Sequence, residues 1–593
     1  YTLVPSWWMM VLLGVFAATI LWLPQTRWKD IFSEGWASLM YVQNWALAAS
    51  SVDYGAADHS SASPLQHFWS QSIQGQVFIL WPVIFAVCAL IAKASGARYR
   101  VVLAYAFGTI FVVSLAFSVY ETDMHQALAY FDTRARLWEF ALGSLLAIVL
   151  PLLDYSLATR VFLGWAGVAA MLACGVFLQV QQQFPGYMAL WPTLAACMVI
   201  VAGNTGSRLG VARILASKPI TFLGGHSYAL HPWHWPLLVF ARHFAIRELT
   251  TAERLGVLLA SVALAMASWR FIERPFRGRH GILPRRRLFR LAAFTMACLC
   301  AVGLASVARS GWPQRLDLQT RQLLAGADDR NPRREACSFL DAQALRAGRA
   351  CRIGRPDAQE PSFIVWGDSH ADALMTAFDR LATERGQAGL YLGKIGCPPL
   401  LDVERVDSPF GCLAFNDAAR DLIASSPARR VIIVARWSHF TSEPTVGQEE
   451  RQRVVIADAE SKQRDVRGND AVLARGLERT LEFLGPRRVF VVSTVPEIGY
   501  PVPQTLAQVR RLGRDVDIRP TVDQYRQRQH GVEAMLEDAR RRHGFTSLNP
   551  ASGLCGTGRC QVESAGRPLY FDEHHLSVHG AEAVAETLRP AFE

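Results

Sequence analysis

The chain has 593 residues, 51% of them hydrophobic, and a formal net charge of +11, so it is too long for a single hydrophobic core. The whole charge excess lies in residues 1–310, which hold 23 Lys and Arg against 12 Asp and Glu, whereas residues 311–593 hold 38 of each. A nucleic-acid-binding protein would cluster basic residues on its soluble part. The charge pattern therefore excludes nucleic acid as the expected partner and indicates membrane topology.

Long apolar runs with few charges recur up to about residue 310 and predict helices that cross a lipid bilayer. Nine runs approach the length that crossing requires, which argues against a soluble protein with buried helices. The predicted spans are 7–23, 75–92, 101–119, 136–153, 161–179, 187–203, 222–241, 254–271 and 289–308.

The loops between these spans indicate the orientation. Nine spans place the two ends of the chain on opposite sides of the membrane. With residue 1 in the cytoplasm, the inner loop at 270–290 carries eight Arg residues, whereas the outer loop at 181–187 carries no basic residue. The positive-inside rule then places the residues after 309 outside the cytoplasm. The chain begins with Tyr1 and not Met, and we expect it to be incomplete at its N-terminus.

The cysteines agree with this orientation. Five of the 11 lie in predicted spans and six in residues 311–593, and an even number in an oxidising compartment suggests disulfides. The alternative is six free, buried thiols. Among the 15 possible connectivities, we favour the near-neighbour pairs Cys337–Cys351, Cys397–Cys412 and Cys555–Cys560.

Several polar side chains of the membrane half fall at membrane depth or at its edge. Ionisable groups are costly there and are usually retained for a site or pathway. A His beside interfacial aromatic residues can also belong to the aromatic belt, which is the alternative for the first candidate taken alone. The candidate site residues are His67, Ser70, Arg136, Glu139 and His234.

Four stretches, in chain order, resemble the acyltransferase family 3 membrane proteins: HFWSQSIQGQVFILWP, RLWEFALGSLLA, LGGHSYALHPWHWPLLVF and SWRFIERPFR. The resemblance covers nearly all of residues 1–280 and implies O-acylation of extracytoplasmic polysaccharides. Many members carry a Glu-Glu run where this chain has Ile73, Gln74 and Gly75, so no carboxylate role is carried over. The resemblance also implies that the family's first two helices, with a catalytic His, lie upstream of Tyr1, and that the chain as it stands does not complete the membrane step.

The remaining residues alternate β-like and helical patterns. The stretches PSFIVWGDSH, RRVIIVARW and RRVFVVSTVP predict strands, and residues 371–382, 472–485 and 523–541 predict helices. This alternation is typical of a parallel sheet with helices on both faces. Ligands then bind at the carboxyl ends of the strands.

A Ser-His-Asp site is predicted at such an end. Ser369 lies in GDSH, between a predicted strand and helix, where a hydroxyl can face solvent near the helix N-terminus. A single Gly-Asp-Ser motif more often indicates only a surface turn. About 200 residues later, the spacing of Asp572 and His575 lets the carboxylate reach the imidazole Nδ1–H. Together, the motif around Ser369 and the motif around Asp572 and His575 resemble the SGNH hydrolase family. This resemblance implies that the three residues form the catalytic triad.

The same resemblance implies an oxyanion hole, for which Gly393 or Gly396 could supply an amide. Trp437 stands where the family usually has Asn, so we expect a slow hydrolase or a specialised transferase. The spare His574 and His579 are expected to be structural or surface residues. The spacing of His370, His574, His575 and Asp572 matches no familiar zinc motif, and no metal and no bound cofactor are expected.

The predicted fold class is a polytopic α-helical membrane domain plus an α/β SGNH-hydrolase-like domain. We expect a membrane acyltransferase region at 1–280, a final transmembrane helix at 281–310, a periplasmic linker or ordered extension at 311–359 and the SGNH domain at 360–593. The resemblance implies a multi-pass bacterial inner-membrane enzyme, with its C-terminal domain in the periplasm. It implies transfer of acetyl from cytoplasmic acetyl-CoA to an envelope glycan such as lipopolysaccharide O-antigen. The alternatives are a membrane-tethered glycan O-acetylesterase and a glycan-binding transporter.

Overall fold

The computed structural model describes residues 6–24, 27–52, 63–177, 184–247, 249–273, 285–309, 314, 316–358, 360–406, 410–443, 446, 454–462 and 465–593. These residues form two compact units, one within residues 1–312 and one within residues 313–593. The first is called the membrane unit here and the second the soluble unit.

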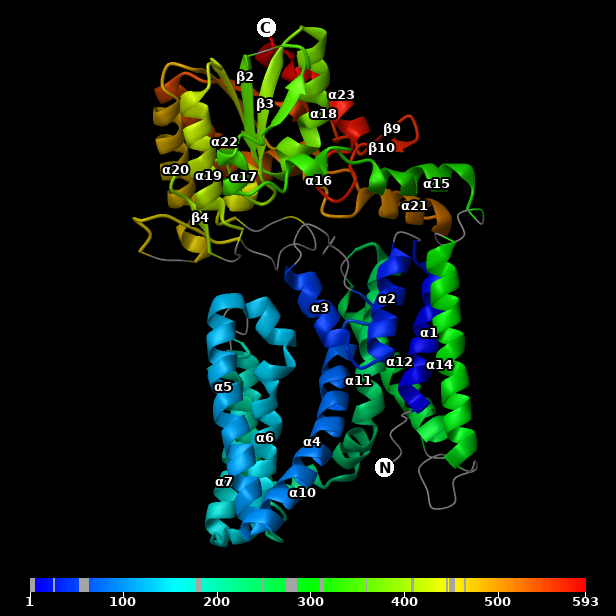
Figure 1. The fold of residues 1–593 in the computed structure, drawn as a ribbon. Helices are drawn as coiled ribbons and strands as arrows, with labels where there is room; N and C mark the ends of the chain where they lie inside the picture. Colours follow the sequence, from blue (N-terminus) through cyan, green and yellow to red (C-terminus); the bar gives the residue numbers. More distant parts are fainter. Residues whose placement is uncertain are drawn as a thin grey trace. The chain divides into compact units, whose positions relative to one another are not determined.

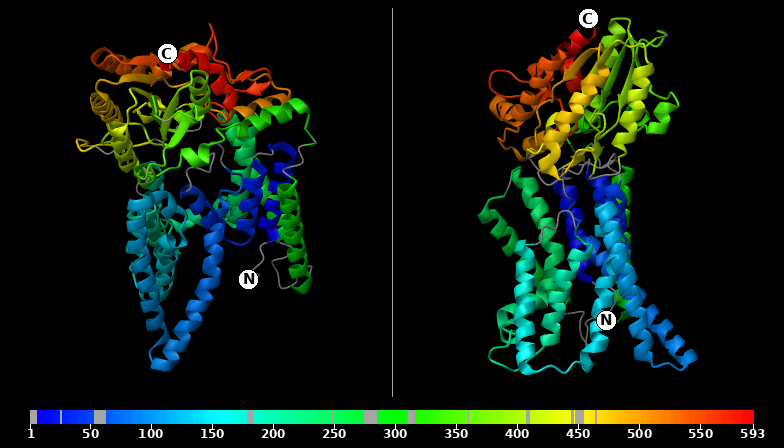
Figure 2. Two further views of the ribbon diagram at one scale, coloured as in Figure 1. Left: turned by 45° about the horizontal axis from the view of Figure 1, so that its top comes forward. Right: turned by 90° about the vertical axis from the view of Figure 1, so that its left-hand side faces the viewer.

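The described part of the membrane unit is helical (Figure 1). Its helices are α1 (Ser6–Trp22), α2 (Trp28–Leu39), α3 (Gln43–Val52), α4 (Phe68–Ser95), α5 (Tyr99–Phe131), α6 (Thr133–Val149), α7 (Leu157–Phe177), α9 (Leu190–Ala202), α10 (Ala212–Leu215), α11 (Lys218–Ala245), α12 (Thr251–Ser268) and α14 (Arg285–Ala308). Long helices lie side by side within this unit (Figures 1 and 2), as in the pair α5 and α6 and the pair α11 and α12.

Helices occupy all nine predicted runs. Five described segments are long and apolar enough to cross a membrane: Phe68–Ser95, Tyr99–Gln126, Thr133–Leu152, Leu157–Phe177 and Thr251–Phe271. The chain between the first two predicted spans contains α2 and α3. In α2 the buried residues Trp28, Ile31, Phe32 and Leu39 form one apolar face, and the helix is too short to resemble a span.

The described soluble unit mixes helices and strands. Its helices are α15 (Leu318–Ala325), α16 (Arg334–Cys337), α17 (Ala342–Arg346), α18 (Ser369–Glu384), α19 (Cys412–Ser425), α20 (Asn469–Leu484), α21 (Val502–Leu512), α22 (Val522–His543) and α23 (Val578–Leu588). Its strands are β1 (Cys351–Gly354), β2 (Phe363–Gly367), β3 (Ala388–Gly393), β4 (Glu404–Arg405), β5 (Arg430–Val434), β6 (Ile456–Ala457), β7 (Arg488–Val492), β8 (Thr546–Leu548), β9 (Glu563–Ser564) and β10 (Arg567–Pro568).

Six strands form the central sheet in the order β1-β3-β2-β5-β7-β8. The pairs from β3 to β8 are parallel, and β1 pairs with β3 in the antiparallel sense. The predicted parallel sheet is confirmed from β3 to β8, and β1 adds an antiparallel strand at one edge. The predicted strands and helices correspond to β2, β5, β7, α18, α20 and α22. β1 and β8 were not predicted, because their four and three residues are too few for a clear period. The six residues of β3, AGLYLG, were missed because Ala and Gly are uncommon in strands.

Helices cover both faces of this sheet (Figure 1). Successive residues of β2 alternate between two hydrophobic cores, with Phe363 and Val365 in one and Ile364 and Trp366 in the other. The first core includes residues of α18 and α23, and the second includes residues of α19, α20 and α22. Because the buried strands are apolar on both sides, the sheet is rigid and can hold catalytic loops at its carboxyl end.

Three disulfides lie in the soluble unit, and they confirm the near-neighbour pairing: Cys337–Cys351, Cys397–Cys412 and Cys555–Cys560. The first disulfide joins α16 to β1. Residues 316–358 are thus tied to the sheet, to which they contribute its edge strand.

Candidate active site

Ser369 is the first residue of α18, directly after the turn that follows β2. The turn needs glycine at Gly367, because a Cβ there would lie 2.2 Å from the carbonyl oxygen of Val434 on β5. Ser369 is partly exposed, whereas its neighbours Asp368 and His370 are buried. Of the first-turn amides of α18, those of His370, Ala371 and Asp372 donate to Asp368. This leaves the amide of Ser369 itself, at the helix N-terminus, to face an anion.

Asp368 holds this turn in place. Its Oδ1 accepts a hydrogen bond from the His370 amide, and its Oδ2 accepts one from the Arg436 amide after β5, both at 2.8 Å. Burial raises the pKa of Asp368 to about 6, and the two amide donors oppose the rise. Asp368 is therefore the N-cap of α18 and also a clamp between β2 and β5.

The structure brings Ser369, His575 and Asp572 into one hydrogen-bonded chain. The Ser369 hydroxyl lies 2.7 Å from Nε2 of His575, and Nδ1 of the same ring lies 2.6 Å from Oδ2 of Asp572. Oδ1 of Asp572 accepts hydrogen bonds from the amides of His574 at 3.0 Å and His575 at 2.7 Å. With Nδ1 donating to Asp572, Nε2 is left to accept the serine proton.

The electrostatics also favour a neutral His575 beside a charged Asp572. Burial lowers the pKa of His575, Asp572 opposes the shift and the charges of His574 and Arg334 add to it, so that the pKa lies at about 4. Burial alone would raise the pKa of Asp572, but His575, His574 and the hydrogen bonds outweigh it, so the pKa lies below its ordinary value. At neutral pH the imidazole is neutral and the carboxylate is charged, as a general base and its orienting partner require.

The His575 ring is also supported by Phe571 and Arg330, which the sequence analysis did not single out. Phe571 stacks on it, with ring centroids 5.1 Å apart and planes within 7°. The Arg330 guanidinium lies 4.9 Å from the Phe571 centroid, within the range of a cation–π contact. The only sequence signal for this support is the position of Phe571, directly before the Asp572 motif.

Contacts of Asp372, which were not predicted either, connect residues 316–358 to α18. Asp372, three residues after Ser369, is fully buried and forms an ion pair with Arg334 at 2.5 Å. It also accepts hydrogen bonds from Asn331 and Ser338, both at 2.7 Å. Because Asp372 is on α18, these contacts fix the helix that presents Ser369.

The two oxyanion candidates lie in the segment that includes the end of β3. Gly393 is the last residue of β3 and stands opposite Gly367 in the parallel register. Gly396 has a positive φ of 76°, and its carbonyl oxygen accepts a hydrogen bond from Arg405. Their role in an oxyanion hole stays a prediction.

Trp437, at the position where Asn was expected, is a core residue. It is fully buried, and its indole N–H donates to the carbonyl oxygen of Val492 at 2.8 Å. The adjacent Arg436 forms a buried ion pair with Glu497, which also pairs with Arg528 at 2.7 Å. These ion pairs hold Arg436 in place. Its backbone amide, which donates to Asp368, is thereby positioned as well.

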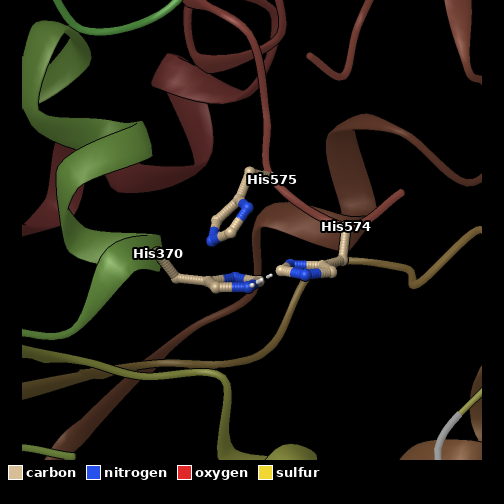
Figure 3. A group of neighbouring side chains, drawn as sticks. All are labelled: His370, His574 and His575. Carbon is tan, nitrogen blue, oxygen red and sulfur yellow. Dashed lines mark hydrogen bonds between the residues drawn. The ribbon is translucent and has the colours of Figure 1, made fainter. Parts of the chain in front are cut away.

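Three histidines gather at the site (Figure 3). Nε2 of His370 lies 3.3 Å from Nδ1 of His574, and the two rings are nearly coplanar. With His575 they form a group in which one ring nitrogen from each residue lies within 4.8 Å of the other two, and the three could hold a metal ion. His574 is buried, so it is not a surface residue. The predicted spare His579 is partly buried, and its amide donates to Asp329.

The candidates of the membrane unit form two groups. His67, before α4, stacks on Trp235 and His231 of α11, with centroid distances of 4.3 and 5.1 Å. The Ser70 hydroxyl donates to the His67 carbonyl oxygen, and His234 lies 3.4 Å from the Ser261 hydroxyl. Their role in acyl transfer stays a prediction.

Arg136 and Glu139 form the second group, an ion pair of 2.6 Å on α6. The Arg136 guanidinium lies between 5.2 and 5.4 Å from the rings of Trp69, Tyr130 and Phe184. Such packing satisfies a buried cation inside the unit.

A polar network that the sequence analysis missed joins α3, α4 and α6. The Gln76 amide nitrogen lies 2.9 Å from Oδ1 of Asn44, and the Thr133 hydroxyl donates to Gln76. Gln76 directly follows Gly75, at the place where this chain lacks the Glu-Glu run of many family 3 members.

Comparison with known proteins agrees with this description. Residues 336–590 match the family model of the SGNH domain fused to AT3 domains. A protein of Komagataeibacter xylinus named membrane-bound transacylase BcsY is 30% identical over 312 residues, which are 52% of this chain and 74% of BcsY. The O-acetyltransferase OatA of Staphylococcus aureus is 25% identical over 268 residues, 42% of this chain and 43% of OatA. The chain thus matches less than half the length of OatA.

Among solved structures, the periplasmic domain of the lipopolysaccharide acetyltransferase of Salmonella ser. Paratyphi A matches 45% of this chain and 91% of its own, with 13% identity and a TM-score of 0.32. The SGNH model at the C-terminus and the similarity to BcsY decide the family. The chain belongs to the acyltransferase family 3 membrane proteins that carry a C-terminal SGNH domain.

Proposed function

We propose that the chain transfers acetyl groups to hydroxyls of a cell-envelope glycan, with Ser369 as the nucleophile of the transfer outside the cytoplasm. The observation that carries this proposal is the hydrogen-bonded chain from Ser369 through His575 to Asp572, in a protein that also has a family 3 membrane unit. The names of BcsY and OatA, a transacylase and an O-acetyltransferase, support transfer.

The reaction has two half-steps. His575 Nε2 takes the proton of Ser369 as Oγ attacks the acyl carbonyl, and the imidazolium then gives that proton to the departing donor group. A sugar hydroxyl next attacks the acyl-serine, gives its proton to Nε2, and leaves as the O-acyl glycan while Ser369 regains its proton. The amide of Ser369, at the N-terminus of α18, can stabilise the oxyanion in both half-steps.

The donor and the acceptor are part of the proposal. We propose that the membrane unit takes acetyl from acetyl-CoA in the cytoplasm and passes it across the inner membrane to the soluble unit in the periplasm. The three disulfides of the soluble unit, beside five free cysteines in the membrane unit, support an oxidising location for Ser369. The acceptor proposed is an exported polysaccharide such as lipopolysaccharide O-antigen.

A complementation experiment tests this function. Cells that lack the gene receive the intact gene, its Ser369→Ala variant or a matched Ser425→Ala variant, since Ser425 is exposed on α19 and bonds only to backbone of its own helix. Ester-linked acetyl is measured separately in the lipopolysaccharide and peptidoglycan fractions. The intact gene and Ser425→Ala should restore acetylation of one fraction, and Ser369→Ala should not.

The same experiment distinguishes acetyl transfer from the two alternatives, because each predicts a different change in acetyl content. A glycan O-acetylesterase would make acetyl content rise in the deletion strain and fall on complementation. A glycan-binding transporter would make the Ser369→Ala variant as effective as the intact gene. Either result would reject the proposed transfer.

A further inference from the structure

Three imidazoles that are distant in sequence share one buried place beside the nucleophile. His370 comes from the first turn of α18, and His574 and His575 come from the loop before α23. Only 4%, 7% and 9% of the three residues is exposed. Figure 3 shows His370 and His574 edge to edge, with His575 beside them. The proposed reaction uses only His575, so two buried histidines have no role in it.

We propose that these three histidines bind a divalent transition-metal ion, with Zn²⁺ as the expected ion, and that the bound ion reversibly inhibits the Ser369 site. The inhibitory effect rests on the proposed function, because it acts through the nucleophile. The binding itself depends only on the three side chains.

The distances suit such an ion. Zinc binds imidazole nitrogen at about 2.0–2.1 Å in tetrahedral geometry, which places two ligand nitrogens about 3.3–3.4 Å apart. His370 Nε2 and His574 Nδ1 are already 3.3 Å apart, and all three ligand atoms lie within 4.8 Å of one another. The rings must turn to aim their lone pairs at a common point. The ring that donates the hydrogen bond between His370 and His574 must also move its hydrogen to its other nitrogen.

Asp572 strengthens the case, because its contact with His575 is the arrangement found behind zinc-binding histidines. A carboxylate that accepts from the far ring nitrogen fixes the tautomer and makes the near nitrogen a better ligand. Here Oδ2 of Asp572 lies 2.6 Å from Nδ1 of His575. The contact that prepares His575 as a base therefore also prepares its Nε2 as a metal ligand.

Binding would inhibit the enzyme for the same reason. The lone pair of His575 Nε2 cannot accept the serine proton while it binds a metal ion. The Ser369 hydroxyl, 2.7 Å from that nitrogen, is placed to become the fourth ligand. Ser369 is partly exposed, so an ion can arrive from the side that the acyl donor uses. A site built from imidazole favours zinc, copper or nickel over magnesium or calcium.

The test uses the full-length protein in detergent, first stripped of metal with EDTA and then dialysed against Zn²⁺. Two quantities are measured: zinc bound per chain, and the rate at which a fluorophosphonate probe labels Ser369, each variant being compared with its own zinc-free rate. The variants are His574→Gln, His370→Gln and the matched control His530→Gln, since His530 is exposed on α22. Thermal unfolding checks that each variant is folded.

Zinc should slow labelling of the wild type and of His530→Gln by about 100-fold or more, because the labelling loses its general base, and EDTA should restore it. His574→Gln and His370→Gln should each bind one zinc ion fewer per chain, and zinc should no longer slow their labelling. Zinc held by other histidines, such as His67 and His231, stays in all the variants and cancels in the comparison.

Equal zinc content in the wild type, His574→Gln and His370→Gln would overturn the metal site. Labelling of the wild type that saturating zinc leaves unchanged would overturn the inhibition. If the probe fails to label Ser369 even without zinc, the proposed function fails, whereas the difference in zinc content still decides the metal site.

Discussion

Replacing Asp572 by Asn tests the proposed triad most directly, because the surrounding hydrogen bonds dictate how an asparagine would lie. Oδ1 of Asp572 accepts from the amides of His574 and His575, so the asparagine carbonyl oxygen must take that position. Its NH₂ group then takes the place of Oδ2, 2.6 Å from Nδ1 of His575. An N–H donor at that place needs an acceptor, so Nδ1 loses its hydrogen and Nε2 gains one.

An imidazole with hydrogen on Nε2 cannot accept the proton of Ser369. The same exchange in a serine protease lowers kcat by about 10⁴, which corresponds to about 5 kcal/mol in the activation barrier. We expect a loss of this size in the hydrolysis of p-nitrophenyl acetate by the purified full-length protein. Stability should fall much less, since the two backbone amides keep their acceptor.

The assay compares Asp572→Asn with Ser369→Ala and with the wild type, and thermal unfolding of each protein is measured in parallel. If Asp572→Asn keeps its fold and retains more than about a tenth of the wild-type rate, a cost near 1.4 kcal/mol, Asp572 does not set the tautomer of His575. The reasoning from hydrogen-bond direction would then be wrong.

Three further results are expected. Because the pKa of His575 is about 4, the imidazole stays neutral as pH falls from about 8 to about 6, and hydrolysis should decline only as pH approaches about 4; an acid limb near 6.5, the ordinary value for His, would contradict this. Arg334→Met leaves the buried carboxylate of Asp372 without its charge partner and should cost about 3–5 kcal/mol in the free energy of unfolding, measured by chemical denaturation; a cost below about 1 kcal/mol would be typical of an exposed ion pair. Replacing Cys337 and Cys351 by Ser opens a disulfide with a sequence separation of 14 and should cost about 3 kcal/mol under oxidising conditions, and the difference from the wild type should shrink when a reductant is present.

Much of the architecture was predictable because it depends on local patterns. Apolar runs of nearly bilayer length marked the helices of the membrane unit, since the lipid core imposes both length and composition on them. The strands β2, β5 and β7 were found because a strand buried on both faces is a continuous apolar run. The three residues of β8 were missed because so few carry no measurable period, and β3 was missed because its Ala and Gly residues are not typical of strands.

The site was predictable only where a short sequence motif contains most of the geometry. The motifs around Ser369 and His575 each span only a strand-to-helix turn or a single turn of chain, so their resemblance to a family could be recognised. Arg330 and Arg334 could not be found this way. They lie on short segments before the sheet begins, and only packing against Phe571 and Asp372 gives them a relation to the site.

By itself, the sequence determined the division into an apolar and a charged half and favoured the near-neighbour cysteine pairs, because composition and short spacings can be read directly from the chain. It also predicted Ser369 as a nucleophile with His575 as its base, from the resemblance of two motifs to a family. Only the tertiary structure decided that residues 369 and 575 are in hydrogen-bond contact and that β1 runs against its neighbour. It also decided that His370 meets His574. Each of these depends on where the sheet brings distant loops together, and no local interaction contains that information.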